Sequence, residues 1–161
     1  MTNIAIDKAS LVADIAGNMT LEAAEHALAS EGLTLGLDPK GLRRETTIAE
    51  WLAEGAPGAR DPWLDPVDHL VAGLDARLAD GKELRVRPSP RRAVGPDLVA
   101  LLFGTRGRFG TITRAHLRVH PRGGRRAETH PFVRERAPAL SQGERDLFDA
   151  IAREMRVSTS G

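Results

Sequence analysis

Two stretches in which apolar and polar residues alternate constrain the fold more than any other feature of the sequence. Residues 70–78 alternate, an Asp80-Gly81 turn follows, and Leu84 and Val86 continue the pattern on the return. Residues 111–120 alternate in the same way. Successive side chains of a strand point to opposite faces of a sheet, and Asp-Gly is a frequent hairpin turn. We therefore expect half-buried strands in an antiparallel or mixed sheet.

The second stretch differs from the first in the character of its polar face. Apolar residues occupy one face and basic residues the other: Ala115, Leu117 and Val119 against Arg114, His116, Arg118 and His120. One face of this strand is therefore predicted to contact the core and the other to form a basic surface.

Two helices are predicted to flank the sheet, which gives an α+β fold class. Thr20 can cap a helix over residues 21–31, where apolar residues recur at helical spacing. Thr47 and Glu50 have the spacing of a capping box, and the helix that they begin is expected to end at Gly55.

Two shorter elements complete the first 121 residues. Residues 3–14 have the pattern of a β-hairpin. Residues 98–103 are expected to form a short helix that ends at Gly104. We expect a first domain over residues 1–121.

The end of the chain has a different character. Residues 122–140 contain a glycine pair, two prolines and many arginines, which is typical of an exposed basic linker. Residues 141–157 begin with a capping-box pattern and carry an apolar stripe at helical spacing, formed by Leu147, Phe148, Ile151 and Met155. This helix is expected either to pack on the core of its own chain or to dock on a partner.

Composition narrows the functional classes. The 161 residues are 41% hydrophobic and 28% charged, as in an ordinary globular domain. The chain has no cysteine, which excludes disulfides, thiolate metal sites and a cysteine nucleophile. The histidines lack paired ligand spacing and the serines lack a nucleophile elbow, so we expect no metal and no hydrolase chemistry. Without an apolar run long enough to span a membrane, or a signal peptide, the predicted location is cytoplasmic.

Charge is distributed unevenly along the chain. Residues 1–81 hold 6 basic and 14 acidic side chains, whereas residues 82–126 hold 12 basic and 2 acidic ones. The basic block is compatible with a solvated face, an acidic or phosphate-bearing ligand, or nucleic acid. A nucleic-acid interface would use Arg85, Arg87, Arg91, Arg92, Arg114 and Arg118. The 4% aromatic content leaves few stacking platforms, so nucleic acid is the least favoured partner.

The glycine-rich segment Gly104–Thr113 joins the predicted short helix to the basic strand. Its glycines recur every third residue, at Gly104, Gly107 and Gly110. Glycine lets a backbone approach a ligand closely, and exposed N–H groups can hold a phosphate. By spacing alone the segment is also compatible with a plain loop, since it is not the dinucleotide fingerprint G-x-G-x-x-G.

Residues 94–121 resemble the segment D-L-x-x-L-F-x-G-S-x-G-T-L-G-V-I-T-x-A-T-L-R-L-H-P of FAD-linked oxidases of the vanillyl-alcohol oxidase or p-cresol methylhydroxylase type, which include glycolate-oxidase flavin subunits. Residues 47–60 are similar to the T-[IL]-G-G-x-[VL]-A-T-G-A-x-G-[SA]-R loop of that family, and residues 70–84 to its V-L-A-D-G hairpin. With residues 7–39 included, the resemblance covers residues 4–121 in the order of the family.

The resemblance implies an FAD-binding fold in which glycine-rich loops contact the cofactor largely through backbone atoms. The positions that match family contacts are Pro39, Thr47, Ile48, Gly55, Gly58, Gly110 and Ile112. We expect a side chain at Gly110 to remove cofactor binding while leaving the fold intact. The flavin carries the chemistry in such enzymes, so no catalytic residue is assigned.

The sequence also departs from the family pattern. From the resemblance we expect the R-G-G-G-T pyrophosphate loop of the first FAD subdomain to be missing and about forty residues to replace the substrate domain. Glu50 and Glu54 replace a glycine and a threonine in the matching loop, so we expect them to repel a pyrophosphate.

Two main functions therefore stay open. The chain is expected to be a shortened FAD-binding subunit of a flavin-dependent oxidoreductase, completed by a partner chain. The alternative is a non-catalytic relative without cofactor that acts as a structural or interaction module. Either would engage a protein partner or a second copy through the terminal helix or the exposed sheet.

Overall fold

The computed structural model describes residues 3–37, 45–59, 70–88, 98–123 and 142–157. Its helices are α1 (Leu21–Ser30), α2 (Ile48–Ala53) and α3 (Gln142–Val157). Its strands are β1 (Ile4–Asp7), β2 (Val12–Ala16), β3 (Leu33–Thr34), β4 (Val71–Leu78), β5 (Glu83–Val86), β6 (Gly110–Arg118) and β7 (His120–Pro121).

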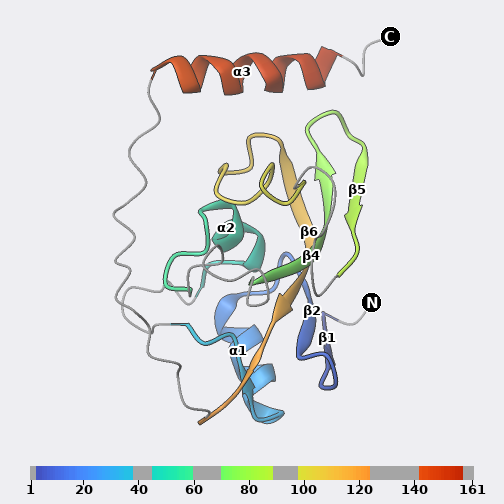
Figure 1. The fold of residues 1–161 in the computed structure, drawn as a ribbon, viewed down its shortest axis with the longest axis vertical. Coiled ribbons are helices and arrows are strands. Elements are labelled where there is room, and N and C mark those ends of the chain that lie inside the picture. The colour runs from blue at the N-terminus through green and yellow to red at the C-terminus, as the bar shows by residue number, and fades with distance from the viewer. Residues whose placement is uncertain (1–2, 38–44, 60–69, 89–97, 124–141, 158–161) are drawn as a thin grey trace.

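The main sheet has five strands in the order β1-β2-β6-β4-β5, and every neighbouring pair is antiparallel (Figure 1). The long strand β6 lies at its centre, with Ala115 opposite Ile15 of β2 and opposite Leu74 of β4. Strands β3 and β7 form a separate two-stranded sheet. The predicted α+β class, the antiparallel sheet and both hairpins are confirmed.

The core lies between this sheet and the helices α1 and α2, which lie on the same side of the sheet (Figure 1). Ile15 and Leu117 from the sheet have no exposed surface, as has Leu28 of α1, while Trp51 of α2 is 1% exposed. Removal of side chains of this size from water contributes roughly 1.5–3 kcal/mol each. The helices α1 and α2 therefore cover the apolar face that the alternating strands present.

Both helices begin at the threonines expected from the sequence. Thr20 Oγ1 accepts a hydrogen bond from the backbone N–H of Ala23 at 3.2 Å. Thr47 and Glu50 form the complete capping box. A capping side chain satisfies N–H groups that have no partner inside the helix, which fixes where the helix starts.

The prediction of a short helix over residues 98–103 is wrong, because this segment forms turns. The carbonyl of Val99 accepts hydrogen bonds from Leu102 and Phe103, which makes a single turn. One turn gains too few hydrogen bonds to propagate a helix, and Gly104 follows with a φ of 74°. Burial of the Val99 and Leu102 side chains holds the segment in place.

Strand β4 is not half-buried along its whole length as expected. Residues 71–74 are all buried, and the alternation appears only after them. The backbone of residues 86–88 lies against Gly73, where an added Cβ would meet Val86 O at 2.4 Å and Pro88 N at 2.7 Å. This close backbone approach covers the outer face of β4 at that point.

The predicted C-terminal helix is present as α3, Gln142–Val157. Ser141, its expected cap, and most of the predicted linker over residues 122–140 lie outside the described residues. Leu147 and Ile151 of the apolar stripe are 59% and 40% exposed.

Candidate functional site

The loop after α2 and the glycine-rich loop before β6 lie side by side. Gly104 donates its N–H to Leu52 O at 3.0 Å, and Arg106 donates its N–H to Ala53 O at 2.8 Å. A Cβ on Gly55 would lie 3.7 Å from the Gly104 Cα. Two segments about fifty residues apart in the sequence thus form one continuous backbone surface.

The loop of residues 104–110 exposes backbone on this surface. Gly104, Arg106 and Gly107 are exposed and have positive φ angles of 74°, 55° and 73°. Glycine adopts this region without steric cost, whereas Arg106 is a non-glycine residue held there by its bond to Ala53. Arg108 follows with a side chain that is 30% exposed. The loop therefore combines exposed backbone with positive charge, although Gly104 and Arg106 already donate their N–H groups within the chain.

The N-terminus of α2 is occupied by a carboxylate of the chain itself. Glu50 Oε2 accepts from the Thr47 N–H at 2.9 Å and from the Thr47 Oγ1 hydroxyl at 2.9 Å. These two hydrogen bonds, the backbone one first, lower the pKa of Glu50. The Ile48 N–H is also engaged, since it donates to Met19 O at 2.8 Å. The positive end of this helix is thus neutralised from within.

Gly17, to which the sequence analysis gave no role, joins α2 to β6. Its N–H donates to Thr113 O, and its carbonyl accepts from Ala49, both at 2.8 Å. An added Cβ would meet Ile112 O at 2.4 Å. In the sequence, the position of Gly17 between the expected β-hairpin and the capping residue Thr20 was the available signal for this contact.

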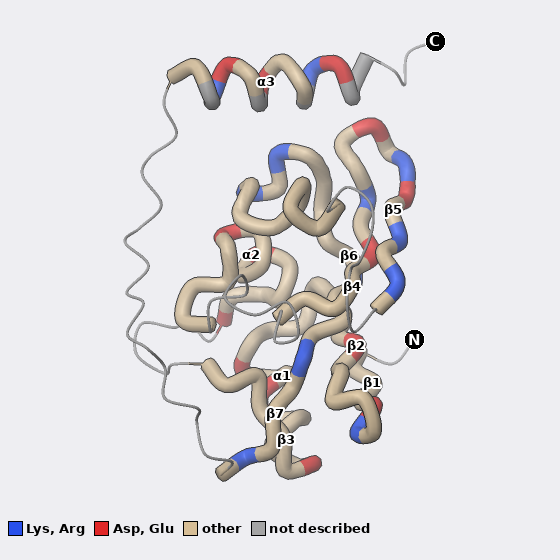
Figure 2. Tube along the Cα trace, in the orientation of Figure 1, with Lys and Arg blue, Asp and Glu red and all other residues tan. Residues whose placement is uncertain are grey.

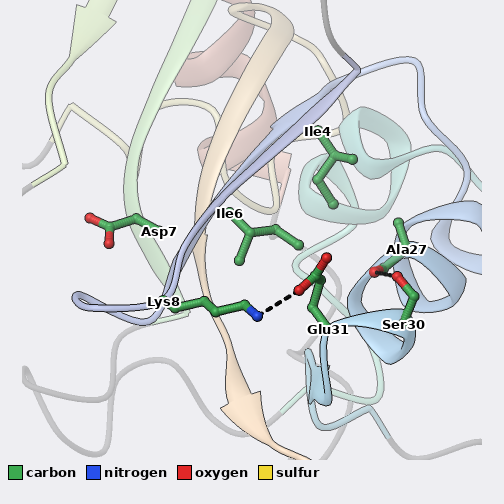
Figure 3. A pocket seen from close by; sticks show the side chains of 7 residues that line it. All are labelled: Ile4, Ile6, Asp7, Lys8, Ala27, Ser30 and Glu31. Carbon is green, nitrogen blue, oxygen red and sulfur yellow. Dashed lines mark hydrogen bonds and ion pairs between the residues drawn. The ribbon is translucent and has the colours of Figure 1, made fainter.

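A separate, open depression of about 530 Å³ lies between β1 and α1, away from these loops (Figure 3). Ile4 and Ile6 form its apolar side, and Lys8 pairs with Glu31 across it at 2.6 Å. Lys8 Nζ and the Glu31 carboxylate neutralise each other there. The depression contains no part of the predicted site.

The charge asymmetry of the sequence is also spatial. Basic positions gather on β5 and on the 104–110 loop, and acidic ones around α1 and α2 (Figure 2). Two of the predicted nucleic-acid arginines have carboxylate partners: Arg114 Nε donates to Asp14 at 2.9 Å, and Arg85 pairs with Glu83 at 3.2 Å. Arg91 and Arg92 lie outside the described residues. Part of the described basic block is therefore paired with carboxylates of this chain.

Comparison with known proteins identifies relatives of this chain. It is 30% identical over 116 residues to the uncharacterized FAD-linked oxidoreductase YgcU of Escherichia coli K12, and 34% identical over 99 residues to the glycolate oxidase subunit GlcE of the same strain. The chain is a homologue of FAD-linked oxidoreductases. This FAD-linked oxidoreductase homologue is also 29% identical over 122 residues to the D-lactate dehydrogenase of Archaeoglobus fulgidus.

The alignments cover most of this homologue and a small part of each relative. They span 72%, 61% and 75% of its length, but only 24%, 28% and 27% of YgcU, GlcE and the dehydrogenase. The chain therefore spans about a quarter of these relatives. No family model matches it.

The fold comparison agrees with this relationship. A solved structure of alkyldihydroxyacetonephosphate synthase superimposes with a TM-score of 0.61 at 22% sequence identity, over 74% of this homologue and 21% of the synthase. The match shows a common fold. The resemblance inferred from the sequence to the FAD-linked oxidases is confirmed.

The positions implied by the resemblance differ in accessibility. Gly58 is exposed with a φ of 80°, and Gly55 is half-buried with a φ of 85°. Gly110 is buried, and the side chains of Ile48 and Ile112 are 0% and 4% exposed. Pro39 lies outside the described residues.

The expectation that a side chain at Gly110 leaves the fold intact is wrong on geometric grounds. A Cβ at this position would meet Arg77 O at 2.5 Å and the Leu78 Cα at 2.9 Å. Both are backbone atoms of β4, paired here with β6. Gly110 is thus required for the central strand pair itself.

The described residues fit FAD on one side only. The exposed backbone of residues 104–107 allows close approach of a nucleotide, and Arg108 adds positive charge beside it, with its guanidinium 3.4 Å from Asp149 Oδ1. At α2, Thr47 and Ile48 already donate their N–H groups within the chain, so that end does not fit a phosphate. The Glu50 carboxylate thus accepts a hydrogen bond from the backbone N–H of Thr47 that a phosphate would otherwise use. This adds to the charge repulsion of a pyrophosphate that we expect from the sequence.

The part of the chain that the structure describes shows neither a metal site nor a membrane-spanning helix. No group of three His, Asp or Glu side chains there is arranged to hold a metal ion. Among the same residues, no helix has the length and apolarity needed to cross a bilayer.

Proposed function

We propose that this chain supplies one part of the FAD-binding site of a flavin-dependent oxidoreductase. The observation that carries the proposal is the apposition of the 104–110 loop and the loop after α2, through the bonds from Gly104 to Leu52 and from Arg106 to Ala53. The FAD-linked relatives support it. In this proposal residues 1–121 form the flavin-type domain, and residues 122–140 link it to α3.

The proposed contacts are the seven positions named from the resemblance: Pro39, Thr47, Ile48, Gly55, Gly58, Gly110 and Ile112. When bound, FAD supplies the electron-transfer chemistry, and the protein binds and orients it. The exposed 104–107 backbone and Arg108 would hold a nucleotide from one side. Other residues, in a partner chain, would enclose its opposite side and bind the organic substrate.

Assembly and location belong to the same proposal. GlcE is named as a subunit of glycolate oxidase, so a protein partner is plausible for this homologue as well. We place the contact with a partner or a second copy on α3 or on the open face of the sheet. The cytoplasmic location stays a prediction from the sequence.

The test compares FAD binding by the full chain with binding by two glycine variants. Gly55→Ala adds a methyl group between the two loops, and Gly81→Ala adds one in the distant β4–β5 turn, where nothing lies within 4 Å. Both glycines have a similar positive φ, so both variants carry similar strain. FAD titration followed by flavin fluorescence should show binding that Gly55→Ala weakens and Gly81→Ala does not. Equal effects of the two variants would contradict the proposed site.

A second candidate function is favoured by the capping box. Because Glu50 occupies the helix end that a phosphate would use, the chain also fits a non-catalytic interaction module without cofactor. Glu50→Ala distinguishes the two functions. A flavin site should bind FAD more tightly when this carboxylate is removed, whereas a module should bind none in either form.

A further inference from the structure

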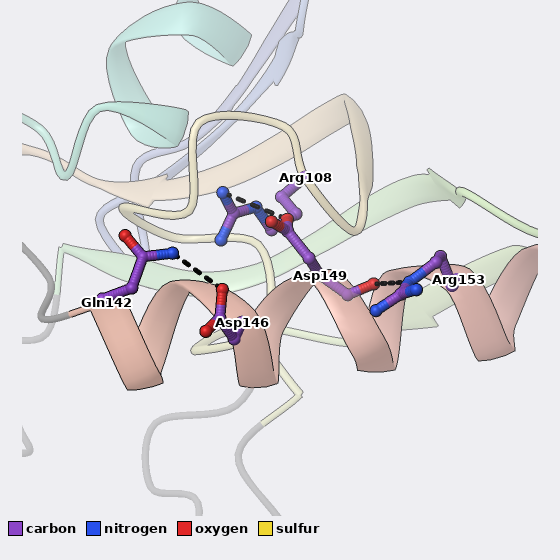
Figure 4. A network of polar contacts seen from close by, with 5 residues as sticks. All are labelled: Arg108, Gln142, Asp146, Asp149 and Arg153. Atoms are coloured by element: carbon purple, nitrogen blue, oxygen red, sulfur yellow. Dashed lines mark hydrogen bonds and ion pairs between the residues drawn. The ribbon is translucent and has the colours of Figure 1, made fainter.

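Helix α3 contacts the rest of the protein through its polar face (Figure 4). Asp149 Oδ1 lies 3.4 Å from an Arg108 guanidinium nitrogen on the glycine-rich loop, and the Arg108 and Asp149 side chains are 30% and 59% exposed. On the helix itself, Gln142 Nε2 donates to Asp146 at 2.8 Å. Positions 142, 146 and 149 are three or four residues apart, so they lie on one face of the helix. This face carries the carboxylate that meets the loop.

The apolar side chains of α3 that the structure describes are exposed. Leu147 and Ile151 are 59% and 40% exposed, and the core includes no described residue of this helix. Ion pairs between exposed side chains contribute little to stability and are screened by salt. The pair of Asp149 with Arg108 is therefore an attachment that a competing anion can displace.

Arg108 belongs to the loop that would hold a nucleotide in the proposed function. A guanidinium group presents several N–H donors in a fork, and this fork binds carboxylate and phosphate oxygens alike. Gly104 and Gly107 beside it are exposed, and a glycine lets a ligand approach the backbone closely. Asp149 thus binds the same guanidinium group that the phosphate of such a ligand would need.

The charges of the two segments favour this kind of competition. The loop over residues 104–110 holds two arginines and no acidic residue. Residues 142–149 of α3 hold three carboxylates and one arginine, whereas residues 150–157 hold two arginines and one glutamate. The acidic half of the helix is the half that meets the basic loop. Because both segments belong to one chain, the Asp149 carboxylate has a high effective concentration at Arg108.

We propose that α3 is a displaceable anionic lid on the glycine-rich loop, in which Asp149 competes with the phosphate of a nucleotide for Arg108. The inference rests on the proposed function for the identity of the ligand, because it concerns regulation of the same site. When a phosphate-bearing ligand binds Arg108, Asp149 leaves and α3 is released from the loop. The lid lowers the affinity of the loop for such a ligand by about two- to fivefold, the effect of one exposed ion pair.

The first test measures the attachment of α3 in the full chain without ligand, by amide hydrogen exchange of residues 142–157. Asp149→Asn removes the charge and keeps the size of the side chain, so α3 should exchange faster than in the wild type. Arg108→Gln changes no residue of α3 and should accelerate the exchange to the same extent. The double variant should exchange no faster than either single variant, because both remove the same ion pair.

Asp146→Asn is the matched control for the charge of the helix. It removes the same charge from the same face, from a side chain whose described bond is to Gln142 of the same helix. Its effect on the exchange of α3 should be smaller than that of Asp149→Asn. Equal effects of the two variants would contradict the lid.

The second test adds the ligand. Inorganic pyrophosphate, in place of sodium chloride at the same ionic strength, should accelerate exchange of α3 in the wild type and have little further effect on Asp149→Asn. In the FAD titration, Asp149→Asn should bind about two- to fivefold more tightly than both the wild type and Asp146→Asn.

The lid and the proposed flavin site can fail separately. The lid is overturned if neither Asp149→Asn nor Arg108→Gln changes the exchange of α3, or if Asp149→Asn and the wild type bind FAD equally tightly; in the second case the flavin site stands. If pyrophosphate releases α3 but FAD binds to no variant, the flavin site fails and the lid stands for another phosphate-bearing ligand.

Discussion

At the scale of single residues, two glycines allow backbone segments to approach more closely than any side chain would permit. Gly17 and Gly110 lie directly against neighbouring backbone, and an added Cβ would approach a carbonyl oxygen to 2.4 Å and 2.5 Å. Gly81, by contrast, has a positive φ but no neighbour within 4 Å. Glycine thus has two separate uses in this chain, close approach and backbone conformation.

Gly110→Ala should destabilise the protein strongly, because the new Cβ forces β4 and β6 apart. We expect a loss of about 3 kcal/mol or more in the free energy of unfolding, measured by urea denaturation. Gly81→Ala, which adds only backbone strain, should cost about 1 kcal/mol. A Gly110→Ala protein as stable as the Gly81→Ala protein would contradict the described packing.

Glu50 should make stability depend on acidity. Hydrogen bonds from Thr47 lower its pKa in the folded protein, so its contribution is complete above the usual glutamate pKa and is lost as pH falls through the folded-state value. The stability difference between the wild type and Glu50→Ala should therefore be constant near neutral pH and shrink in acid. Denaturation at a series of pH values measures this, and a difference that grows in acid would refute it.

At the scale of elements, α2 connects the sheet to the glycine-rich loop. Its first turn is bonded to Gly17 and Met19, and its last turn accepts the N–H groups of Gly104 and Arg106. The capping box fixes where this short helix starts, and thereby where its terminal carbonyls point. An element of six residues is too short to be stable alone, so its caps and its buried Trp51 matter more than its propensity.

Thr47→Ala should loosen the glycine-rich loop as well as α2. The loss of an N-cap costs about 1 kcal/mol, and fraying of α2 should release the carbonyls that hold Gly104 and Arg106. Amide hydrogen exchange of these two residues should be faster than in the wild type. Thr20→Ala removes the corresponding cap of α1 and should leave their exchange unchanged, and equal effects would argue against this coupling.

At the scale of the whole molecule, the described residues form one packed body to which α3 is attached by charge. The core combines residues from the main sheet, α1, α2 and the 98–109 segment, and it includes no described residue of α3. One contact between α3 and the body is the ion pair of Asp149 with Arg108, both partly exposed. Exposed ion pairs contribute little to stability and are weakened by salt.

Deletion of residues 141–161 should therefore leave the body intact. The free energy of unfolding, measured by urea denaturation, should stay within about 1 kcal/mol of the full chain, since no described residue of α3 belongs to the core and the ion pair with Arg108 is partly exposed. A large loss of stability would show that α3 is part of the core.

The sequence by itself determined the elements whose signals are local. Period-two alternation specified the hairpin and β6, and threonine caps specified the starts of α1 and α2, because both signals act over a few residues. The prediction failed for residues 98–103, because the apolar residues of this segment are compatible with a short helix and with a buried turn. The seven expected FAD contacts were also predicted from short sequence motifs.

Only the tertiary structure decided which of these pieces meet. Three contacts join residues that are far apart in the sequence, so no local pattern encodes them. They are the contact of Gly104 with α2, of Gly110 with the backbone of β4, and of Gly17 with β6. The direction in which α3 turns its apolar face is of the same kind. An amphipathic pattern defines two faces of a helix, and the neighbouring surface determines which of them is covered.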